Sequence, residues 1–343
     1  MTGETLEDRY DKLLLSPGAK PTRLNMSGID NGKIFTLRTV EDTLKIHRFV
    51  REQRPKSAAV IGGGFIGVEM AENLSQLCMK VTVIEYSDHL MAPLDFDMAC
   101  AVHAQMRRRG IELKLSTSVT GFETKGGSVV IHTASGEEMV ADMVLLAVGV
   151  TPDTDLAKRA GLALGLRNSI VVNDRMETSV PDIYAVGDAV EVKHFVTGKK
   201  ALIELAGPAN KQGRIAADNI CGGNSVFDGA QGSSVLKLFD MTVASTGINE
   251  AQAKQAEIDY DRIVLSPASH AGYYPGGKTM TMKVLYERNT LKLLGAQIIG
   301  QEGTDKRIDV IATAIRAGMQ ATELAELDLA YAPPYSSAKD PVN

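Results

Sequence analysis

Apolar positions along the chain fall into two patterns, and their order predicts a mixed α/β protein. Short continuous apolar runs at residues 58–61, 81–84 and 142–149 are typical of buried parallel strands. Residues 40–54 and 95–109 show helical spacing instead, and the first of these helices is expected to end before Pro55. Alternation of strands and helices predicts a parallel sheet covered by helices.

The same two patterns extend to both ends of the chain. A run at 12–15 predicts a buried strand that needs partners on both edges. After about residue 224, β-rich runs are followed by helices, which favours an α+β domain. Further strands are predicted at 111–115, 119–124, 128–133, 138–140, 180–188, 234–239, 242–246, 262–265, 279–286 and 291–299, and further helices at 70–77, 205–219, 305–317 and 322–327.

Composition narrows the class of protein. The chain has 343 residues, of which 44% are hydrophobic and 23% charged, which leaves room for two or three domains. A net charge of −5 gives no reason to expect nucleic acid or an anionic membrane as a partner. No apolar run is long enough for a membrane span, and the polar start does not resemble a signal peptide, so a cytoplasmic location is expected.

The three cysteines, Cys78, Cys100 and Cys221, are widely spaced and form no C-x-x-C pair. This excludes a disulfide scaffold and a zinc ribbon, and no metal site is predicted. Cys78 and Cys100 fall within helical patterns, and Cys221 lies at a predicted helix end. Each is expected to be a small buried hydrophobic residue rather than a reactive thiol.

A glycine motif follows the strand at 58–61 and predicts a dinucleotide site. In this G-x-G-x-x-G pattern, Gly62 permits the tight turn, Gly64 lets the backbone approach a pyrophosphate, and Gly67 lets the helix pack against the strand. The helix directs its first amides and its positive dipole end at the phosphates. Glu85 ends the next strand, 23 positions after Gly62 (85 − 62), close to the spacing of a carboxylate that binds an adenosine ribose.

The residues after Glu85 favour NADH over NADPH. They are Tyr86, Ser87, Asp88 and His89, with no arginine or lysine to bind a 2′-phosphate, which the carboxylate would repel. The alternative is a glycine-rich turn of another α/β protein. Gly149, at the end of a buried strand, is a second expected point of approach to the dinucleotide.

Asp188 follows a strand and Gly187. By sequence alone it is equally suited to accepting a hydrogen bond from a ligand hydroxyl and to capping the following segment.

Several motifs together identify a family. The chain resembles the FAD-dependent pyridine nucleotide-disulfide oxidoreductases in the segments Ser16-Pro-Gly-Ala19, Gly62 to Glu69, Ala147 to Pro152, Thr178 to Asp188 and Leu205 to Arg214. Within that superfamily, His270 to Gly276 and Tyr331 to Asp340 are similar to the coenzyme A-disulfide reductases and their persulfide-reducing relatives. The resemblance covers essentially the whole chain.

The resemblance implies an α/β fold with two Rossmann-like domains, one for FAD and one for NAD, and a C-terminal α+β dimerisation domain. The FAD domain, incomplete here, would comprise residues 1–55 and 150–223, the NAD(P)H domain 56–149 and the dimerisation domain 224–343. The implied activity is NADH-dependent reduction of coenzyme A disulfide or a low-molecular-weight persulfide by a homodimer. Hydride would pass from NADH to FAD, and electrons would then pass to an active-site cysteine.

The resemblance also assigns cofactor residues. Phe65 would lie between nicotinamide and flavin, next to Ile66 of the same motif, and Glu69 would contact the nicotinamide end. Without the family, Phe65 is better explained as core and Glu69 as a charge on a helix surface. The FAD ligands would include Gly18, Gly187, Asp188 and Ala206.

The implied catalytic residues are Tyr273 and Tyr331, which resemble an acid/base and thiolate-stabilising pair acting across the dimer interface. Asn210 and Lys339 match positions that contact the coenzyme A substrate. A phenol can protonate a thiolate leaving group, because the ordinary pKa values of the two groups are about 10 and about 8.5. The alternatives are interface packing for the tyrosines and a solvated charge for the lysine.

One departure from the family pattern matters. In relatives, a first glycine motif for FAD and a redox cysteine come before the segment with which this sequence opens. This sequence contains neither of them there, so it is expected to be N-terminally truncated. A rhodanese domain follows in some relatives. Two rival functions remain: an NADH oxidase or peroxidase with a sulfenic acid cycle, and a non-catalytic NAD-binding, dimerising fragment.

Overall fold

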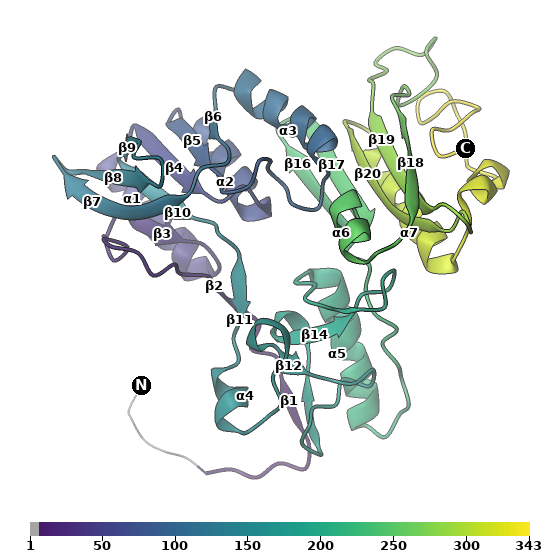
Figure 1. Cartoon of the computed structure of the whole chain (residues 1–343), viewed down its shortest axis with the longest axis horizontal. Helices are drawn as coiled ribbons and strands as arrows, with labels where there is room; N and C mark the ends of the chain where they lie inside the picture. Colours follow the sequence, from purple (N-terminus) through teal and green to yellow (C-terminus); the bar gives the residue numbers. More distant parts are fainter. Residues whose placement is uncertain (1–6) are drawn as a thin grey trace. The chain divides into compact units, whose positions relative to one another are not determined.

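The structure, a computed structural model, describes residues 7–343, so residues 1–6 of the predicted first segment lie outside the described residues. The described chain forms two compact units (Figure 1). The first consists of residues up to 20 and 150–232, and the second of 21–149 and 233–343. Residues 21–149 of the second unit are therefore inserted into the first unit. After residue 232 the chain returns to the second unit.

The first unit is built on short strands. Strand β1 (Leu13–Leu15) pairs in parallel with β13 (Ile183–Ala185), and β12 (Ile170–Val171), β14 (Val190–Lys193) and β15 (Lys200–Ala201) form a three-stranded sheet. Strands β2 (Ala19–Pro21) and β11 (Val150–Pro152) pair where the chain leaves this unit and re-enters it. Helices α4 (Asp155–Arg159) and α5 (Ala206–Ile220) complete the unit.

The expected strand at 12–15 exists, but it is less buried than predicted. Leu15 is buried, whereas Leu14 is 39% exposed. In the described part of the chain, β1 hydrogen-bonds to β13 along one edge. A strand with one neighbour covers fewer of its side chains than a central strand does.

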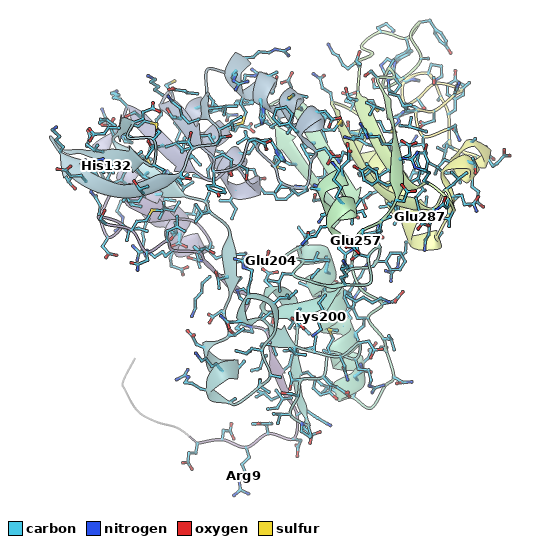
Figure 2. All side chains as sticks on the ribbon, in the orientation of Figure 1. Arg9, His132, Lys200, Glu204, Glu257 and Glu287 are labelled. Atoms are coloured by element: carbon cyan, nitrogen blue, oxygen red, sulfur yellow. The ribbon has the colours of Figure 1, made fainter. Side chains whose placement is uncertain are left out.

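One buried carboxylate in the first unit has a hydrogen-bond or ion-pair partner for each of its oxygens. Glu191, on β14, is 2% exposed and accepts a hydrogen bond from the Leu166 amide at 2.7 Å. Its other oxygen pairs with the ammonium group of Lys200 on β15, which Figure 2 labels. Because a buried carboxylate is costly unless it is paired, this contact stabilises the β14–β15 pairing.

A five-stranded parallel sheet forms the first half of the second unit. Its order is β3 (Ile34–Thr36), β10 (Met143–Leu146), β4 (Ser57–Ile61), β5 (Lys80–Ile84) and β6 (Glu112–Lys114). The central strands β4 and β10 are almost entirely buried, which explains their continuous apolar sequences. Helices α1 (Val40–Gln53), α2 (Phe65–Gln76) and α3 (Phe96–Arg108) belong to this half.

Helix α1 begins and ends as its sequence predicts. Thr39 accepts a hydrogen bond from the Asp42 amide, and the Asp42 carboxylate accepts one from the Thr39 amide, which forms a capping box. The helix ends at Arg54, which adopts a left-handed conformation directly before Pro55.

A three-stranded antiparallel sheet, β7 (Val119–Lys125), β8 (Ser128–Thr133) and β9 (Glu138–Ala141), shares a hydrophobic core with the parallel sheet. Phe122, Val129 and Ile131 pack in this core against Ile61 and Val144. His132, labelled in Figure 2, is partly exposed on β8, and its Nδ1 lies 3.3 Å from a Glu138 oxygen.

The second half of this unit is a five-stranded antiparallel sheet with helices. Its order is β16 (Ser234–Leu238), β17 (Met241–Gly247), β20 (Leu293–Gly300), β19 (Thr281–Glu287) and β18 (Tyr260–Leu265). Helix α7 (Thr304–Ala317) packs on β17 and β20, and α6 (Glu250–Gln255) follows β17. The predicted α/β fold class with a C-terminal α+β part is confirmed.

Two expectations about the elements need correction. Residues 322–327 were expected to be helical, and the structure has a 3₁₀ helix at Ala321–Glu326. Cys78 was expected within a helix, but α2 ends at Gln76 and Cys78 has a positive φ of 61° in the turn that follows. None of the helices in residues 7–343 is long and apolar enough to cross a membrane.

A buried lysine joins the two halves of the second unit. Lys283, on β19, is fully buried, and its Nζ lies 3.0 Å from Asp95, 2.9 Å from Asp97 and 2.5 Å from Glu250. Asp95 and Asp97 lie at the start of α3, and Asp95 also accepts a hydrogen bond from Gln297 of β20 at 2.7 Å. One cation therefore holds α3 and α6 against the C-terminal sheet.

We expect replacement of Lys283 by methionine to destabilise the protein by about 3–5 kcal/mol, because three carboxylates would lose their counterion, one of them in a buried site. The free energy of unfolding is measured by urea denaturation. The matched control is Lys114→Met, since Lys114 also pairs with two carboxylates but is partly exposed. Its loss should not exceed about 1 kcal/mol, and an equal loss in the two variants would contradict the assignment.

Candidate functional site

The glycine motif forms a turn in which two positions leave no room for a side chain. Gly62 has φ +105°, and a Cβ there would lie 2.3 Å from the Ala147 carbonyl oxygen on the neighbouring strand end. A Cβ on Gly67 would lie 1.9 Å from the Gly62 carbonyl oxygen. Both distances are far below van der Waals contact, so these glycines allow α2 to pack directly against the end of β4.

Gly64 differs from the other two glycines because a Cβ at this position would meet no atom within 4 Å. It is the N-cap of α2, with extended backbone and no side-chain hydrogen bond to the helix. The first amides of an α-helix lack partners within the helix, and the open space lies at this end. The residues therefore fit a dinucleotide whose phosphates approach the backbone at Gly64.

Glu85 contacts the turn itself. Its Oε2 accepts a hydrogen bond from the Gly63 amide at 2.6 Å, and its Oε1 accepts one from the Ser87 amide at 2.8 Å. The predicted ribose carboxylate thus lies beside the glycine turn, with its orientation set by two backbone amides. Each oxygen keeps a further lone pair for a ligand hydroxyl.

The loop after Glu85 is held by a histidine that sequence reasoning did not single out. The Met91 amide donates to the Gly63 carbonyl at 2.9 Å, and the Leu90 amide donates to His103 Nε2 at 3.1 Å. His103 is 3% exposed on α3. Burial, and then the charge of Arg107, lower the pKa of His103 to about 4, so the neutral ring can accept this hydrogen bond.

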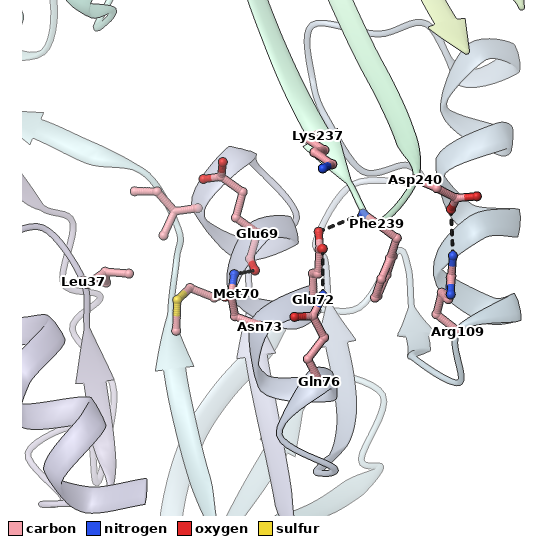
Figure 3. Close-up of a pocket in the computed structure, with 11 residues that line it drawn as sticks. Leu37, Glu69, Met70, Glu72, Asn73, Gln76, Arg109, Lys237, Phe239 and Asp240 are labelled. Carbon is pink, nitrogen blue, oxygen red and sulfur yellow. Dashed lines mark hydrogen bonds and ion pairs between the residues drawn. The ribbon is translucent and has the colours of Figure 1, made fainter. Parts of the chain in front are cut away.

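A cavity of about 670 Å³ lies along α2, and Figure 3 shows its walls. One side is the face of α2 that carries Ile66 and Glu69, and the other is the β16–β17 turn with Phe239 and Asp240. Burial, and then the negative charge of Glu72, raise the pKa of Glu69. The complete lining is Leu37, Ile66, Glu69, Met70, Glu72, Asn73, Gln76, Arg109, Lys237, Phe239 and Asp240.

Two further residues of this region, Arg109 and Phe65, have defined packing contacts. Arg109, directly after α3, pairs with Asp240 at 2.7 Å, and its guanidinium lies 4.8 Å from the Phe239 ring centroid. Phe65, at the start of α2, is half-buried and packs against the core of the parallel sheet. Contacts such as Arg109–Asp240 join residues far apart in the sequence, so helical spacing gave no signal for them.

In the first unit, the predicted flavin residues lie at strand ends and a helix start. Ser16 and Gly18 follow β1, and Gly187 and Asp188 follow its parallel partner β13. Gly187 has φ +80°, and a Cβ there would meet only the Ser16 hydroxyl within 4 Å, at 3.9 Å. Its amide donates to Gln212 of α5 at 2.7 Å. Ala206 begins α5, and Asn210 is exposed on it.

The two predicted tyrosines meet. The hydroxyls of Tyr273 and Tyr331 are 2.8 Å apart, although 58 residues separate them. Tyr273 lies between β18 and β19 and is 76% exposed, whereas Tyr331 lies in the C-terminal tail and is 45% exposed. The hydrogen bond with Tyr273 raises the pKa of Tyr331. Lys339, in the same tail, is exposed.

The cysteines do not behave as expected. Cys78, Cys100 and Cys221 are all exposed rather than buried. Cys100 lies on the outer face of α3, and Cys221 lies directly after α5. Each occupies a helix surface or helix end, where helical spacing alone could not tell an outward position from an inward one.

Comparison with known proteins identifies the family. Residues 1–213 match the model of the pyridine nucleotide-disulphide oxidoreductases, and residues 233–341 match the model of their dimerisation domain. The chain belongs to this family, and the resemblance found in the sequence is confirmed.

Individual relatives are also similar. A coenzyme A disulfide reductase of Staphylococcus haemolyticus is 35% identical over 343 residues, which is 100% of this chain and 76% of the relative. The structure of reduced Bacillus anthracis CoADR-RHD is 48% identical with a TM-score of 0.97, covering 100% of this chain and 61% of that chain. A NAD-dependent persulfide reductase from A. fulgidus is 42% identical with a TM-score of 0.94, covering 97% of this chain and 62% of that chain.

We expect His103 to make stability depend on pH. Its pKa is about 4 in the folded protein and about 6.5 in the unfolded chain, so the unfolded state binds more protons between these values. The contribution is complete above pH 6.5 and falls by about 3 kcal/mol as the pH drops to 4. Urea denaturation at several pH values measures it, and His103→Gln should remove this part of the dependence. Parallel pH curves for the two proteins would contradict the assignment.

Proposed function

We propose that the protein uses NADH and FAD to reduce a disulfide or persulfide of the coenzyme A type. The observation that carries this proposal is the Tyr273–Tyr331 contact of 2.8 Å, which pairs two phenols from distant segments. Supporting it are the names of two similar proteins, a coenzyme A disulfide reductase and a NAD-dependent persulfide reductase. A pair of exposed phenols is suited to a reaction that expels a thiolate.

In this proposal the dinucleotide binds at the glycine turn. Gly62, Gly64 and Gly67 form the phosphate site, with Gly149 at the neighbouring strand end, and Glu85 accepts hydrogen bonds from the ribose. NADH is favoured over NADPH because Glu85 and Asp88 would repel a 2′-phosphate. Phe65, Ile66 and Glu69 are assigned to the nicotinamide end, where burial raises the pKa of Glu69.

The flavin is assigned to the first unit. Gly18, Gly187, Asp188 and Ala206 would hold it at the ends of β1 and β13 and at the start of α5. When bound, FAD accepts a hydride from NADH and transfers the two electrons to sulfur. Cys78, Cys100 and Cys221 lie on helix surfaces or near helix ends, and the proposal gives them no role.

The tyrosine pair is assigned the transfer of a proton to the released thiolate. Cleavage of the sulfur–sulfur bond by a thiolate releases a second thiolate, whose ordinary pKa is about 8.5. A phenol with a raised pKa stays protonated at neutral pH, so Tyr331 can donate a hydrogen bond or a proton to that sulfur. Tyr273 supplies the second hydroxyl of the relay, and its exposure leaves the pair accessible to a substrate.

Substrate contacts and assembly complete the proposal. Lys339, exposed in the same C-terminal tail as Tyr331, offers an ammonium group for a coenzyme A phosphate, and Asn210 offers an amide. A homodimer is proposed from the match of residues 233–341 to a dimerisation domain. The exposed apolar side chains of β18, Ile263, Val264 and Leu265, suit such an interface.

We expect Gly64→Ala to weaken NADH binding at least tenfold while changing the free energy of unfolding by no more than about 1 kcal/mol. The added methyl meets no protein atom within 4 Å, so it occupies only the space assigned to the pyrophosphate. Calorimetric titration with NADH gives the Kd. The control is Gly67→Ala, which should destabilise the fold because its Cβ would lie 1.9 Å from a carbonyl oxygen. Unchanged affinity in folded Gly64→Ala would contradict the phosphate assignment.

We expect Tyr331→Phe to lower kcat for coenzyme A disulfide by roughly 10²-fold, because general acid catalysis contributes about that much. NADH consumption by the complete, FAD-loaded protein is followed at its absorption band, with coenzyme A disulfide and hydrogen peroxide compared as acceptors. Tyr335→Phe is the matched control, since Tyr335 lies in the same tail and is 72% exposed. Equal rates for the two variants, or faster turnover of peroxide than of disulfide, would overturn the proposed function.

A further inference from the structure

A fully buried arginine hydrogen-bonds to the two segments that carry the tyrosine pair. Arg307, on the first turn of α7, is 0% exposed, and its guanidinium donates to groups from three segments. Nη1 donates to the Gly303 carbonyl at 3.0 Å, and Nη2 donates to the Ser269 carbonyl at 2.9 Å and to Ser336 Oγ at 3.2 Å. Nε and Nη2 reach the two oxygens of Asp340 at 3.2 and 3.0 Å.

Two of these segments carry the tyrosines. Ser269 precedes Tyr273 by four residues in the connection between β18 and β19, and Ser336 follows Tyr331 by five residues in the tail. The Ala271 amide also donates to the Ser336 carbonyl at 2.9 Å. One guanidinium therefore holds both segments next to each other and fixes them to α7.

The tail closes around this arginine. Asp340 is 4% exposed, accepts from the Ser336 hydroxyl, and accepts from the Val342 amide at 3.0 Å. Burial acts to raise the pKa of Asp340, but these hydrogen bonds and the charge of Arg307 lower it overall, so the carboxylate is ionised at neutral pH. The pair is buried, bidentate and hydrogen-bonded on both sides, which gives it a defined geometry.

Local sequence is adapted to the arginine. A Cβ on Gly303, which has φ +77°, would lie 2.3 Å from Arg307 Nη1, so a side chain there would displace the guanidinium. The five N–H groups of arginine form a planar fork that reaches several acceptors at once, whereas a lysine ammonium acts as one compact charge. The site therefore requires arginine for its shape as well as for its charge.

We propose that Arg307 is a positioning residue that holds the Tyr273 and Tyr331 hydroxyls in contact. It touches neither phenol and acts through Ser269, Ser336 and Asp340. This proposal rests on the proposed function, in which the phenols act at the reacting sulfur.

The test uses Arg307→Lys, with the protein labelled with 3-fluorotyrosine. Signals of the two phenols are assigned by their absence from Tyr273→Phe and Tyr331→Phe, and both are followed by ¹⁹F NMR as a function of pH. In the parent protein, removing Tyr273 should lower the pKa of Tyr331, since their hydrogen bond raises it. In Arg307→Lys we expect this dependence to be lost, because the two segments separate.

Controls separate positioning from general destabilisation. Arg288→Lys alters an arginine that pairs with two carboxylates beside the same sheet but is 53% exposed, and it should leave both phenol titrations unchanged. Ser336→Ala removes only one hydroxyl from the Arg307 site and decides the question if Arg307→Lys does not fold. Titrations that stay coupled in folded Arg307→Lys, or in Ser336→Ala in its place, would overturn the proposal.

Kinetics distinguish this proposal from the function on which it rests. In the complete, FAD-loaded protein we expect Arg307→Lys to lower kcat for disulfide about 10- to 100-fold while the KM for NADH is unchanged, because a small displacement of a catalytic group has this effect. If Tyr331→Phe leaves disulfide reduction intact, the proposed function fails even if the NMR result holds. If Tyr331→Phe is inactive but Arg307→Lys keeps full activity and coupled titrations, only the positioning role fails.

Discussion

The close packing of α2 against the end of β4 is the constraint on which the nucleotide region depends. At Gly62 and Gly67 a single added carbon would lie within 2.3 and 1.9 Å of a carbonyl oxygen. Because both glycines are required, the first turn of α2 begins directly at the strand end, and the open position at Gly64 faces the helix amides. Glu85 accepts a hydrogen bond from the Gly63 amide, and the Met91 amide donates one to the Gly63 carbonyl, so the loop after β5 also fixes this turn.

Two buried cations organise the rest of the second unit. Lys283 gathers carboxylates from α3 and α6, and Arg307 gathers the β18–β19 connection and the tail. A complete buried ion pair adds little net stability relative to a set of apolar residues, because removing charges from water is expensive, although removing one partner alone is strongly destabilising. They do specify which partners meet, since a misplaced segment would leave a charge buried and unpaired. The tyrosine contact is the exposed result of one such arrangement.

Much of the architecture could be predicted from local patterns. The parallel strands, the glycine turn and helix α1 were all predicted within a few residues, because continuous apolar runs, capping residues and glycine spacing report local requirements. The predictions failed where exposure depends on a distant neighbour. Cys78, Cys100 and Cys221 were expected to be buried and are exposed, and Leu14 is exposed because β1 has one paired edge in the described chain.

In the candidate site, too, local features were predictable from the sequence and long-range contacts were not. Sequence by itself determined the residue types and the order of the nucleotide turn, since a strand, three glycines, a helix and an acidic residue follow one another within one short stretch of chain. Sequence also singled out Tyr273 and Tyr331 through their family motifs, but not their contact. Only the tertiary structure decided that contact, the role of His103 beneath the loop and the enclosure of Arg307 by Ser269, Ser336 and Asp340. Each of these contacts joins residues that are far apart in the sequence, where the periodicity of helices and strands predicts no contact. Only the packing of the whole unit brings them together.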